Sequence, residues 1–259
     1  GIGGFSLLHP LFHHLKECDF FYFADTAYSP WGDLDTALLK SRIQTIIHYF
    51  ESHNVDTIII ACNTSSILFY EEIKARTKIK VIQLVDLLCE SAITQSLNKN
   101  ITVLATNNTV NVKGFSKTLS KMNTESIVTE IACPSFVPAI ENENSSESEL
   151  SQLVEQQLHK IKNTVSDTLI YGCTHYPFLD HYIRKYIRPD IVIISSQTIV
   201  SALIKRLEIG LYQISKITNK TSITNTLNLY DSGNSQSLKA WCLKLGLLTT
   251  HTTLTQRKK

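Results

Sequence analysis

The sequence predicts an α/β fold in which mostly parallel sheets carry helices on both faces. Short apolar, β-branched runs alternate with longer segments of helical periodicity, which is typical of this class. Some of the runs are almost continuously apolar, as residues 57–61 are, and a strand buried on both faces has this character. A repeated nonapeptide, described below, further divides the chain into two similar three-layer domains related by a pseudo-two-fold axis.

Each strand is expected where an apolar run is bounded by polar or turn-forming residues. The expected strands are residues 20–24, 57–61, 80–85, 101–105, 127–132, 168–171, 191–194 and 226–230. The expected helices are residues 36–52, 65–76, 88–97, 110–121, 147–162 and 198–212. The acidic segment 141–149 is expected to be a surface loop, and residues 256–259 a solvated tail.

The composition excludes several classes of protein. The 259 residues include 25 Lys+Arg and 23 Asp+Glu, and a formal net charge of +2 predicts neither nucleic acid nor an anionic membrane surface as a partner. No apolar run approaches the roughly 20 residues of a membrane-spanning helix. The length is sufficient for one or two domains with proper cores.

The six cysteines are widely spaced, and the closest two are 27 residues apart. Without a Cys-x-x-Cys pair, neither a zinc ribbon nor a dithiol redox motif is expected. With sparse cysteines and no visible signal peptide, we expect reduced thiols in a cytoplasmic protein. A cysteine outside any motif is expected to be a buried and unreactive side chain. This expectation applies to Cys18, Cys89, Cys133 and Cys242.

Two cysteines are different because they lie in an internal repeat. Residues 56–64 read Asp-Thr-Ile-Ile-Ile-Ala-Cys-Asn-Thr, and residues 167–175 read Asp-Thr-Leu-Ile-Tyr-Gly-Cys-Thr-His, 111 residues later. Each copy predicts a buried strand that ends in a small residue, followed by a cysteine where a helix opens. Cys62 and Cys173 are therefore expected at the carboxyl ends of equivalent strands, where open α/β sheets bind ligands.

A thiol at a helix N-terminus is expected to have a lowered pKa, because the helix dipole favours the thiolate. The neighbouring Asn63, Thr64 and Thr174 and the free N–H groups could bind a carboxylate. Two facing thiols favour stereoinversion, in which one removes a proton from a carbon and the other delivers one to the opposite face. A disulfide and a pair of inert core cysteines are the alternatives.

Several segments resemble the aspartate/glutamate racemases, and glutamate racemase within that family. The two cysteine segments, residues 61–64 and 172–177, carry the most specific resemblance. Other segments agree with it: residues 1–6, residues 25–32, residues 103–106 with Thr109, and residues 133–138 with Glu141. The resemblance covers nearly the whole chain, from Gly1 to about Gly246.

The resemblance implies two α/β domains with the active site between them, which we place at residues 1–90 plus 200–259 and residues 91–199. It implies a racemase without cofactor or metal that supplies D-glutamate for bacterial peptidoglycan, often as a homodimer. By position, Cys62 and Cys173 would be the acid/base thiols, and Glu141 and His175 would assist proton transfer. The implied substrate-binding residues are Trp31, Gly32, Asn63, Thr64, Thr109, Thr174 and His175.

Two departures from the family pattern concern the site and the start of the chain, and a third is residues 85–87, where the family commonly has a Glu-Pro-type turn. Trp31 stands where the family usually has Tyr, which removes a hydroxyl from that position. The chain begins at Gly1, and its one methionine is Met122, so we expect an N-terminal piece to be missing. By the resemblance, this piece would hold the opening strand of the first sheet and an Asp-Ser pair.

Other functions remain open at the level of the sequence. Aspartate and hydantoin racemases share the thiol pair and differ in the pocket. A thiol hydrolase or transferase would use Cys173 as nucleophile and His175 as base, but it has no need of a second thiol. A non-catalytic or impaired chain would follow from the absence of the Asp-Ser pair.

Overall fold

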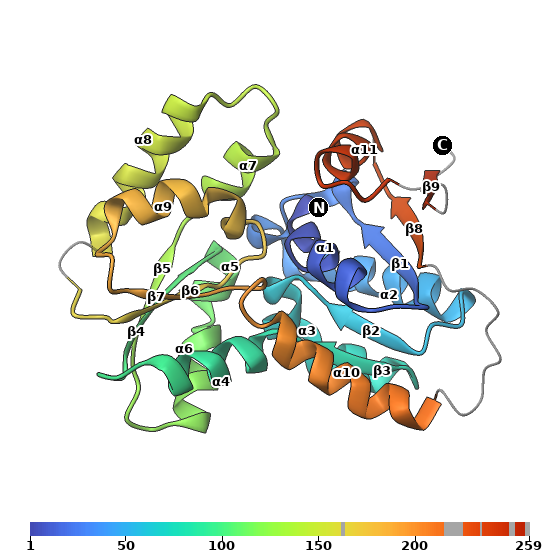
Figure 1. Ribbon diagram of the computed structural model, residues 1–259, viewed down its shortest axis with the longest axis horizontal. Coiled ribbons are helices and arrows are strands. Elements are labelled where there is room, and N and C mark those ends of the chain that lie inside the picture. Colours follow the sequence, from blue (N-terminus) through green and yellow to red (C-terminus); the bar gives the residue numbers. More distant parts are fainter. Residues whose placement is uncertain (162–163, 215–224, 234, 249–251, 257–259) are drawn as a thin grey trace.

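The computed structural model describes residues 1–161, 164–214, 225–233, 235–248 and 252–256. The chain forms two lobes that lie side by side, each with a parallel sheet between helices (Figure 1). All strand pairs among the described residues are parallel. The α/β class with parallel sheets is therefore confirmed.

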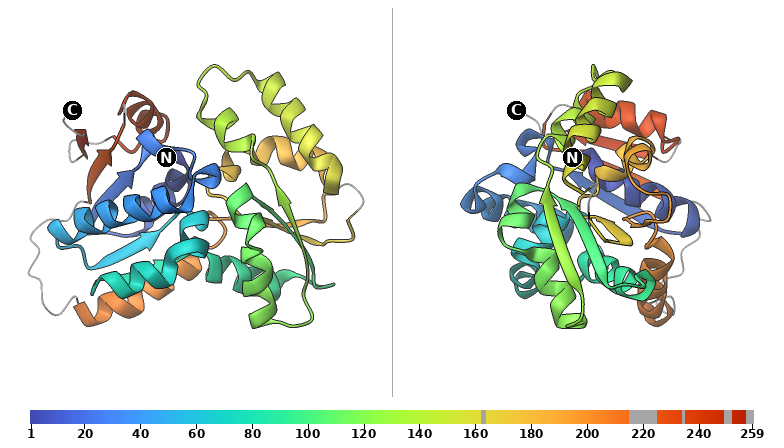
Figure 2. Two further views of the ribbon diagram at one scale, coloured as in Figure 1. Left: turned by 180° about the vertical axis from the view of Figure 1, so that it is seen from behind. Right: turned by 90° about the vertical axis from the view of Figure 1, so that its left-hand side faces the viewer.

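The second lobe contains one continuous sheet in the order β5-β4-β6-β7. The strands are β4 (Asn100–Ala105), β5 (Ile127–Ala132), β6 (Thr168–Tyr171) and β7 (Val192–Ile194). Helices α4 (Val85–Gln95) and α6 (Gly114–Met122) cover one face, and α7 (Phe136–Glu141), α8 (Glu147–Leu158) and α9 (Asp180–Tyr186) cover the other (Figure 2). Because β6 is central and covered on both faces, all four of its residues are buried.

The first lobe has a sheet in two parts. One part has the order β1-β8-β9, with strands Asp19–Ala24, Thr226–Asp231 and Thr252–Gln256, and the other pairs β2 (Thr57–Ile60) with β3 (Lys80–Gln83). Helices α1 (Phe5–His14) and α10 (Val200–Ile214) cover one face, and α2 (Thr36–Ser52) and α3 (Asn63–Arg76) cover the other. Helix α11 (Ser235–Lys244) packs beside β8.

No backbone pairing joins β1 to β2 among the described residues, so each strand has one unpaired edge. Residues of both edges line a single cavity of about 800 Å³, together with apolar side chains of α1 and α2. The cavity continues to the carboxyl ends of the strands, where the repeated cysteines lie.

The expected strands are all present, with ends shifted by a few residues. The expected strand 80–85 ends at Gln83 because α4 begins at Val85. The expected helix 110–121 was wrong as one element: it is divided into α5 (Asn107–Asn111) and α6, because Lys113 between them has a left-handed backbone with φ of 52°. The expected helix 147–162 ends earlier, as α8 and a 3₁₀ turn, and residue 162 lies outside the described residues.

Two expected surface segments were also wrong in part. Glu141 is the last residue of α7 rather than the start of a loop, and Gln256 belongs to β9 rather than to a tail. Residues 257–259 lie outside the described residues. No helix in the described part of the chain is long and apolar enough to cross a membrane.

Candidate active site

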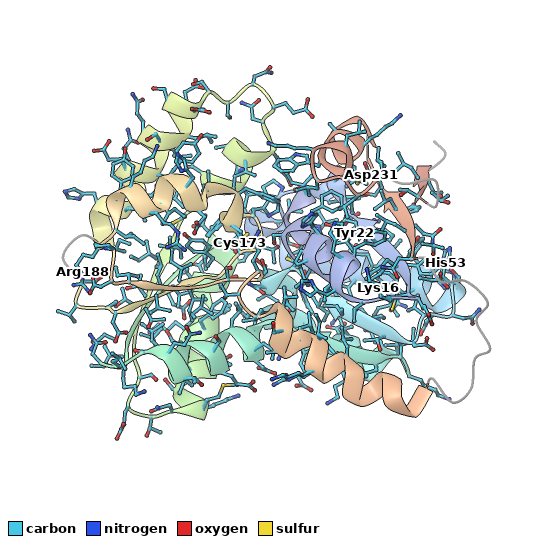
Figure 3. The ribbon with its side chains drawn as sticks, viewed as in Figure 1. Lys16, Tyr22, His53, Cys173, Arg188 and Asp231 are labelled. Carbon is cyan, nitrogen blue, oxygen red and sulfur yellow. The ribbon has the colours of Figure 1, made fainter. Side chains whose placement is uncertain are left out.

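The two repeated cysteines occupy equivalent positions at the carboxyl ends of their strands. Cys62 follows β2 by two residues and is the N-cap residue of α3, and Cys173 follows β6 and Gly172. Both side chains line the 800 Å³ cavity. Figure 3 shows Cys173 between the two lobes, with Tyr22 of β1 on the side of the first lobe. The repeat thus brings one thiol from each lobe to one cavity.

The polar residues beside Cys62 form one wall of the cavity. Asn63 is 2% exposed, and neither its amide nitrogen nor its amide oxygen has a hydrogen-bond partner among the described residues. The unpaired N–H groups of the first turn of α3 lie next to it, because α3 begins at Asn63. A buried amide without partners, at the positive end of a helix, fits a bound carboxylate or ammonium group.

Thr64 belongs to a cluster of three hydroxyl groups that joins the lobes. Its Oγ1 lies 2.9 Å from Oγ1 of Thr106 and 3.3 Å from Oγ1 of Thr109. Thr106 also donates to Thr109 over 3.2 Å. Thr64 and Thr106 line the cavity, whereas Thr109 is fully buried and reaches it only through them. Thr109 therefore acts on the cavity through the other two hydroxyls.

Cys173 is part of a relay within the second lobe. Its Sγ lies 3.7 Å from Nδ1 of His175, and Nε2 of His175 lies 2.8 Å from Oε1 of Glu141. Burial raises the pKa of Glu141, but the hydrogen bond and charge of His175, the charge of the Gly1 terminal amine and a hydrogen bond from Ser29 together outweigh it and lower the pKa to about 2. Burial lowers the pKa of His175, against the opposing effect of Glu141. The relay therefore pairs an ionised carboxylate with a neutral imidazole.

The expected lowering of the pKa was wrong for Cys173. Burial raises its pKa well above that of a free thiol, and negative charge on Cys62 or Glu141 raises it further. The backbone N–H of His175 acts in the opposite direction but is weaker. A short 3₁₀ turn, Tyr176–Leu179, follows Cys173 instead of an α-helix, so the helix dipole contributes little. In this state Cys173 is a protonated thiol.

A loop of the first lobe, residues 25–34, closes the site from the other side. Trp31 and Gly32 of this loop line the cavity. Gly32 packs so closely on Thr106 that a Cβ atom would lie 2.5 Å from the Cβ of Thr106. The side chain of Asn108 donates to the backbone oxygens of Trp31 and Leu34, over 3.3 and 3.0 Å. The loop is therefore fixed against the second lobe.

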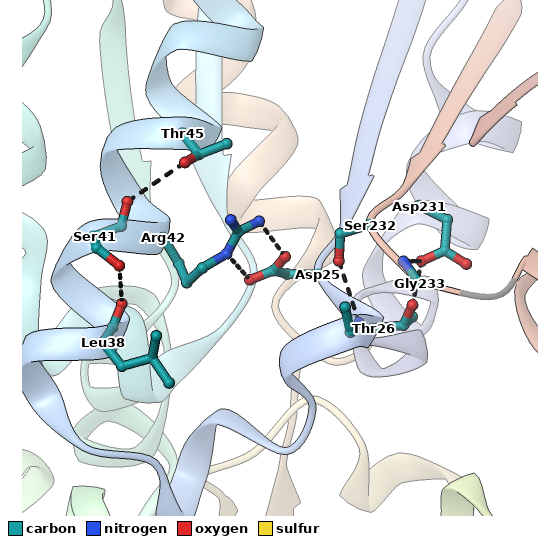
Figure 4. A network of polar contacts seen from close by, with 10 residues as sticks. Asp25, Thr26, Leu38, Ser41, Arg42, Thr45, Asp231, Ser232 and Gly233 are labelled. Atoms are coloured by element: carbon teal, nitrogen blue, oxygen red, sulfur yellow. Dashed lines mark hydrogen bonds and ion pairs between the residues drawn. The ribbon is translucent and has the colours of Figure 1, made fainter. Parts of the chain in front are cut away.

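The base of the same loop is held by a buried ion pair (Figure 4). Asp25, at the end of β1, accepts from Nε and Nη2 of Arg42, over 3.0 and 2.7 Å. The guanidinium of Arg42 lies 4.3 Å from the ring centre of Tyr28. On the other side, Thr26 donates to Asp231, and Ser232 accepts from the backbone of Ala27. The turn after β8, at residues 231–233, thus also anchors this loop.

The cavity gathers most of the residues that the sequence singles out. Trp31, Gly32, Cys62, Asn63, Thr64, Cys173, Thr174 and His175 line it. Glu141 lies behind His175, and Thr109 lies behind Thr64. Sequence reasoning missed Ser29, Thr106 and Asn108. For Ser29 the available signal was its position beside Pro30, Trp31 and Gly32, in a segment already expected at the site.

The site has no visible arrangement for a metal ion. In the described ranges, no group of three or more His, Cys, Asp or Glu side chains could hold one. The described residues of the site include two thiols, a histidine and a carboxylate, which suit acid–base chemistry, next to groups that can bind a carboxylate.

Comparison with known proteins gives a consistent result. Residues 25–203 match the profile of the family described as Asp/Glu/Hydantoin racemase. A glutamate racemase of Picosynechococcus is 32% identical over 210 residues, covering 81% of this chain and 75% of the relative. A glutamate racemase of Sulfurihydrogenibium is 31% identical over 233 residues, covering 89% of this chain and 88% of the relative.

Solved structures agree on the fold. The glutamate racemase of Campylobacter jejuni aligns with a TM-score of 0.82 at 28% identity, covering 96% of this chain and 97% of that one. A glutamate racemase isoform of Bacillus anthracis aligns with a TM-score of 0.87 at 23% identity, covering 100% and 94%. The latter likeness concerns the fold alone.

Two α/β lobes that each bring a cysteine to one cavity, together with these matches, define the class as an amino-acid racemase, an isomerase. The chain belongs to the Asp/Glu/Hydantoin racemase family, and the comparisons support glutamate racemase activity.

Proposed function

We propose that the chain interconverts L- and D-glutamate by a two-base mechanism in which Cys62 and Cys173 act on opposite faces of the substrate. The observation that carries this proposal is the position of the two thiols. They lie at equivalent strand ends, in different lobes, on one cavity. The curated relatives are glutamate racemases, and the solved enzyme of Francisella tularensis is described in complex with D-glutamate.

In each turnover one proton is taken up and another is delivered. One cysteine, as thiolate, removes the α-proton, so that the C–H bond breaks, an S–H bond forms and the electron pair stays on the α-carbon. The opposite thiol then gives its proton to that carbon from the other face, which inverts the configuration. The next turnover in the reverse direction restores the first state.

The relay explains how a buried thiol such as Cys173 can become a base. Its proton passes to Nδ1 of His175, 3.7 Å away, and the resulting imidazolium is stabilised by Glu141 at 2.8 Å. Asn63, Thr64 and Thr174 bind the substrate carboxylate and amine, with Thr109 supporting Thr64. Trp31 and Gly32 cover the substrate from the loop of residues 25–34.

Aspartate is the alternative substrate within the family, and a direct assay separates the two. Incorporation of deuterium at the α-carbon in heavy water should be fast with glutamate and slow with aspartate. Faster exchange with aspartate would reassign the substrate. A covalent acyl-enzyme on Cys173 would instead favour a thiol hydrolase and reject the two-base scheme.

We also propose the cellular setting and the architecture that go with this activity. The product D-glutamate serves peptidoglycan synthesis in the cytoplasm, and a homodimer is the proposed assembly. Growth of a D-glutamate-requiring bacterium on expression of the chain tests the first point, and the mass in solution tests the second. The proposed domains are residues 1–90 plus 200–259 and residues 91–199, and α4 spans their boundary.

The proposed first domain takes one more strand between β1 and β2. The two unpaired parallel edges support this, since both line the same cavity and apolar residues of α1 and α2 close it on either face. A strand inserted there would make the first sheet continuous, as the second sheet is.

A further inference from the structure

Ser29 makes a polar contact between the lobes at the edge of the site. Its hydroxyl Oγ lies 2.8 Å from Oε2 and 3.1 Å from Oε1 of Glu141. Ser29 belongs to the loop of residues 25–34 in the first lobe, whereas Glu141 ends α7 in the second. Neither the family resemblance nor the repeat assigns a role to this residue.

A hydroxyl can donate a single proton, and here both possible acceptors are the oxygens of one carboxylate. Such a donor stabilises the ionised carboxylate over the neutral acid. An ionised Glu141 can only accept hydrogen bonds, so the 2.8 Å contact with Nε2 requires the proton to be on His175. In the neutral imidazole, Nδ1 is then the acceptor that faces the Cys173 thiol.

We propose that Ser29 is a positioning residue, whose hydroxyl holds the Glu141 carboxylate in place and thereby fixes the ring of His175 with Nδ1 toward Cys173. The proposal rests on the proposed function for its catalytic meaning, but the tautomer of His175 can be observed without turnover. Transfer of the thiol proton breaks the S–H bond and forms an N–H bond at Nδ1. Return of the proton reverses both changes, so no further reactant is needed.

The position of Ser29 depends on the rest of its loop. The ion pair of Asp25 with Arg42 holds the loop at its start, and the contacts of Asn108 with Trp31 and Leu34 hold it beyond Pro30. The relay in the second lobe is therefore complete only when this loop of the first lobe lies against it. Ser29 thus links the position of this loop to the geometry of the relay.

Several titratable groups face Glu141 besides His175. They are the Cys173 thiol, the Tyr22 hydroxyl and the terminal amine of Gly1. Gly1 also lies beside the Ser29 hydroxyl, so a shift in the titration of Glu141 is assigned to the lost hydroxyl only if Ser29→Thr, which keeps a hydroxyl, does not show it. A matched control is Ser41→Ala on α2, because the Ser41 hydroxyl bonds only within its own helix, to the Leu38 oxygen.

The test is a ¹⁵N NMR titration of labelled His175 in the full chain and in Ser29→Ala, Ser29→Thr and Ser41→Ala, with His175→Gln to assign the signals. We expect Ser29→Ala to move the Glu141 titration to higher pH and to reduce the Nε2–H tautomer. We expect Ser29→Thr, which keeps a hydroxyl, to behave like the unchanged chain. Equal behaviour of Ser29→Ala and Ser41→Ala would overturn the proposal.

The kinetic measurement is kcat/KM for glutamate as a function of pH in the same variants. For Ser29→Ala we expect a loss of at least about tenfold, as for a lost hydrogen bond to a charged group, with the acid limb displaced to higher pH. A loss with an unchanged pH profile would show a merely structural role and overturn the proposal. If no variant racemises glutamate but the NMR shift is present, the proposed function fails and the positioning of Glu141 by Ser29 stands.

Discussion

The two copies of the cysteine repeat have different surroundings although their sequences follow the same pattern. β6 is flanked by β4 and β7, is buried along its whole length, and leads to a buried Cys173. β2 is paired on one side only, alternates between partly and fully buried residues, and leads to a partly exposed Cys62. Cys62 caps a 14-residue helix, whereas Cys173 is followed by a 3₁₀ turn.

This difference shows that a motif fixes where a thiol lies but not how deeply it is buried. In the first lobe the helix N-terminus and the open cavity surround the thiol. In the second lobe burial dominates, and the pKa of Cys173 is raised. Among the residues that the structure describes, the histidine and glutamate of the relay lie on the second side, next to the buried thiol. Asn63 and Thr64 occupy the corresponding region of the first side.

The largest expected effect is the loss of either thiol. Cys62→Ser and Cys173→Ser should each reduce glutamate racemisation by roughly 10²–10⁴-fold in both directions, because each removes one of the two acid/base groups. Chiral chromatography of the products from L- and D-glutamate measures this. Cys89→Ser, at a buried cysteine away from the cavity, is the control. Near-normal activity in either active-site variant would show that one thiol is sufficient.

The second expected effect is on stability, and it concerns the two-part sheet of the first lobe. A strand of about six Val and Ile residues joined to Gly1 should raise the free energy of unfolding by several kcal/mol, because it buries apolar side chains between β1 and β2. Urea unfolding of the fusion, compared with a Gly/Ser extension of equal length, measures the gain. Equal stability of the two fusions would mean that the cavity does not accept a strand.

The third expected effect is on stability, and it concerns the small residues that precede the two cysteines. A Cβ at Gly172 would lie 2.8 Å from the backbone oxygen of Leu104 and 2.9 Å from the ring of Phe115. Gly172→Ala should therefore cost about 1–3 kcal/mol of stability, as overpacking does. Ala61→Gly, at the partly exposed counterpart, should cost no more than about 1 kcal/mol. Equal costs in urea unfolding would contradict the difference in packing.

The smallest effect is on stability in acid. The pKa of Glu141 is lowered from 4.5 to about 2 in the folded chain, so the stability it contributes is present above about pH 4.5. That contribution should be lost as the pH falls from 4.5 toward 2. Glu141→Gln should lack this part of the pH dependence, whereas the exposed Glu143→Gln should keep it. Identical acid-unfolding profiles for the two variants would reject the assigned pKa.

Much of the fold could be predicted because its signals are local. The edge strand β5 and the buried strand β6 are both rich in apolar, β-branched residues, and both were found with the correct bounds. The signals were weaker for α1, which contains Pro10, and for β9, whose polar threonines do not resemble a buried strand. Lys113 adopts a left-handed conformation that propensity does not foresee.

The candidate site likewise has a part that the sequence predicted and a part that it did not. The repeat and the resemblance together pointed to Cys62, Cys173 and His175, which line one cavity. The contact of Ser29 with Glu141 joins residues 112 positions apart, and no local pattern encodes it. The raised pKa of Cys173 was missed for a related reason: burial in the tertiary structure, rather than the neighbouring sequence, determines it.

The central claim is that two thiols on opposite faces perform the racemisation. The most direct measurement is the early time course of L-glutamate racemisation in heavy water, with the α-hydrogen of substrate and product followed by NMR and chiral separation. The account predicts that D-glutamate carries deuterium from its first appearance while the remaining L-glutamate keeps its protium. Deuterium entering L-glutamate as fast as D-glutamate forms would indicate a single base and would contradict it.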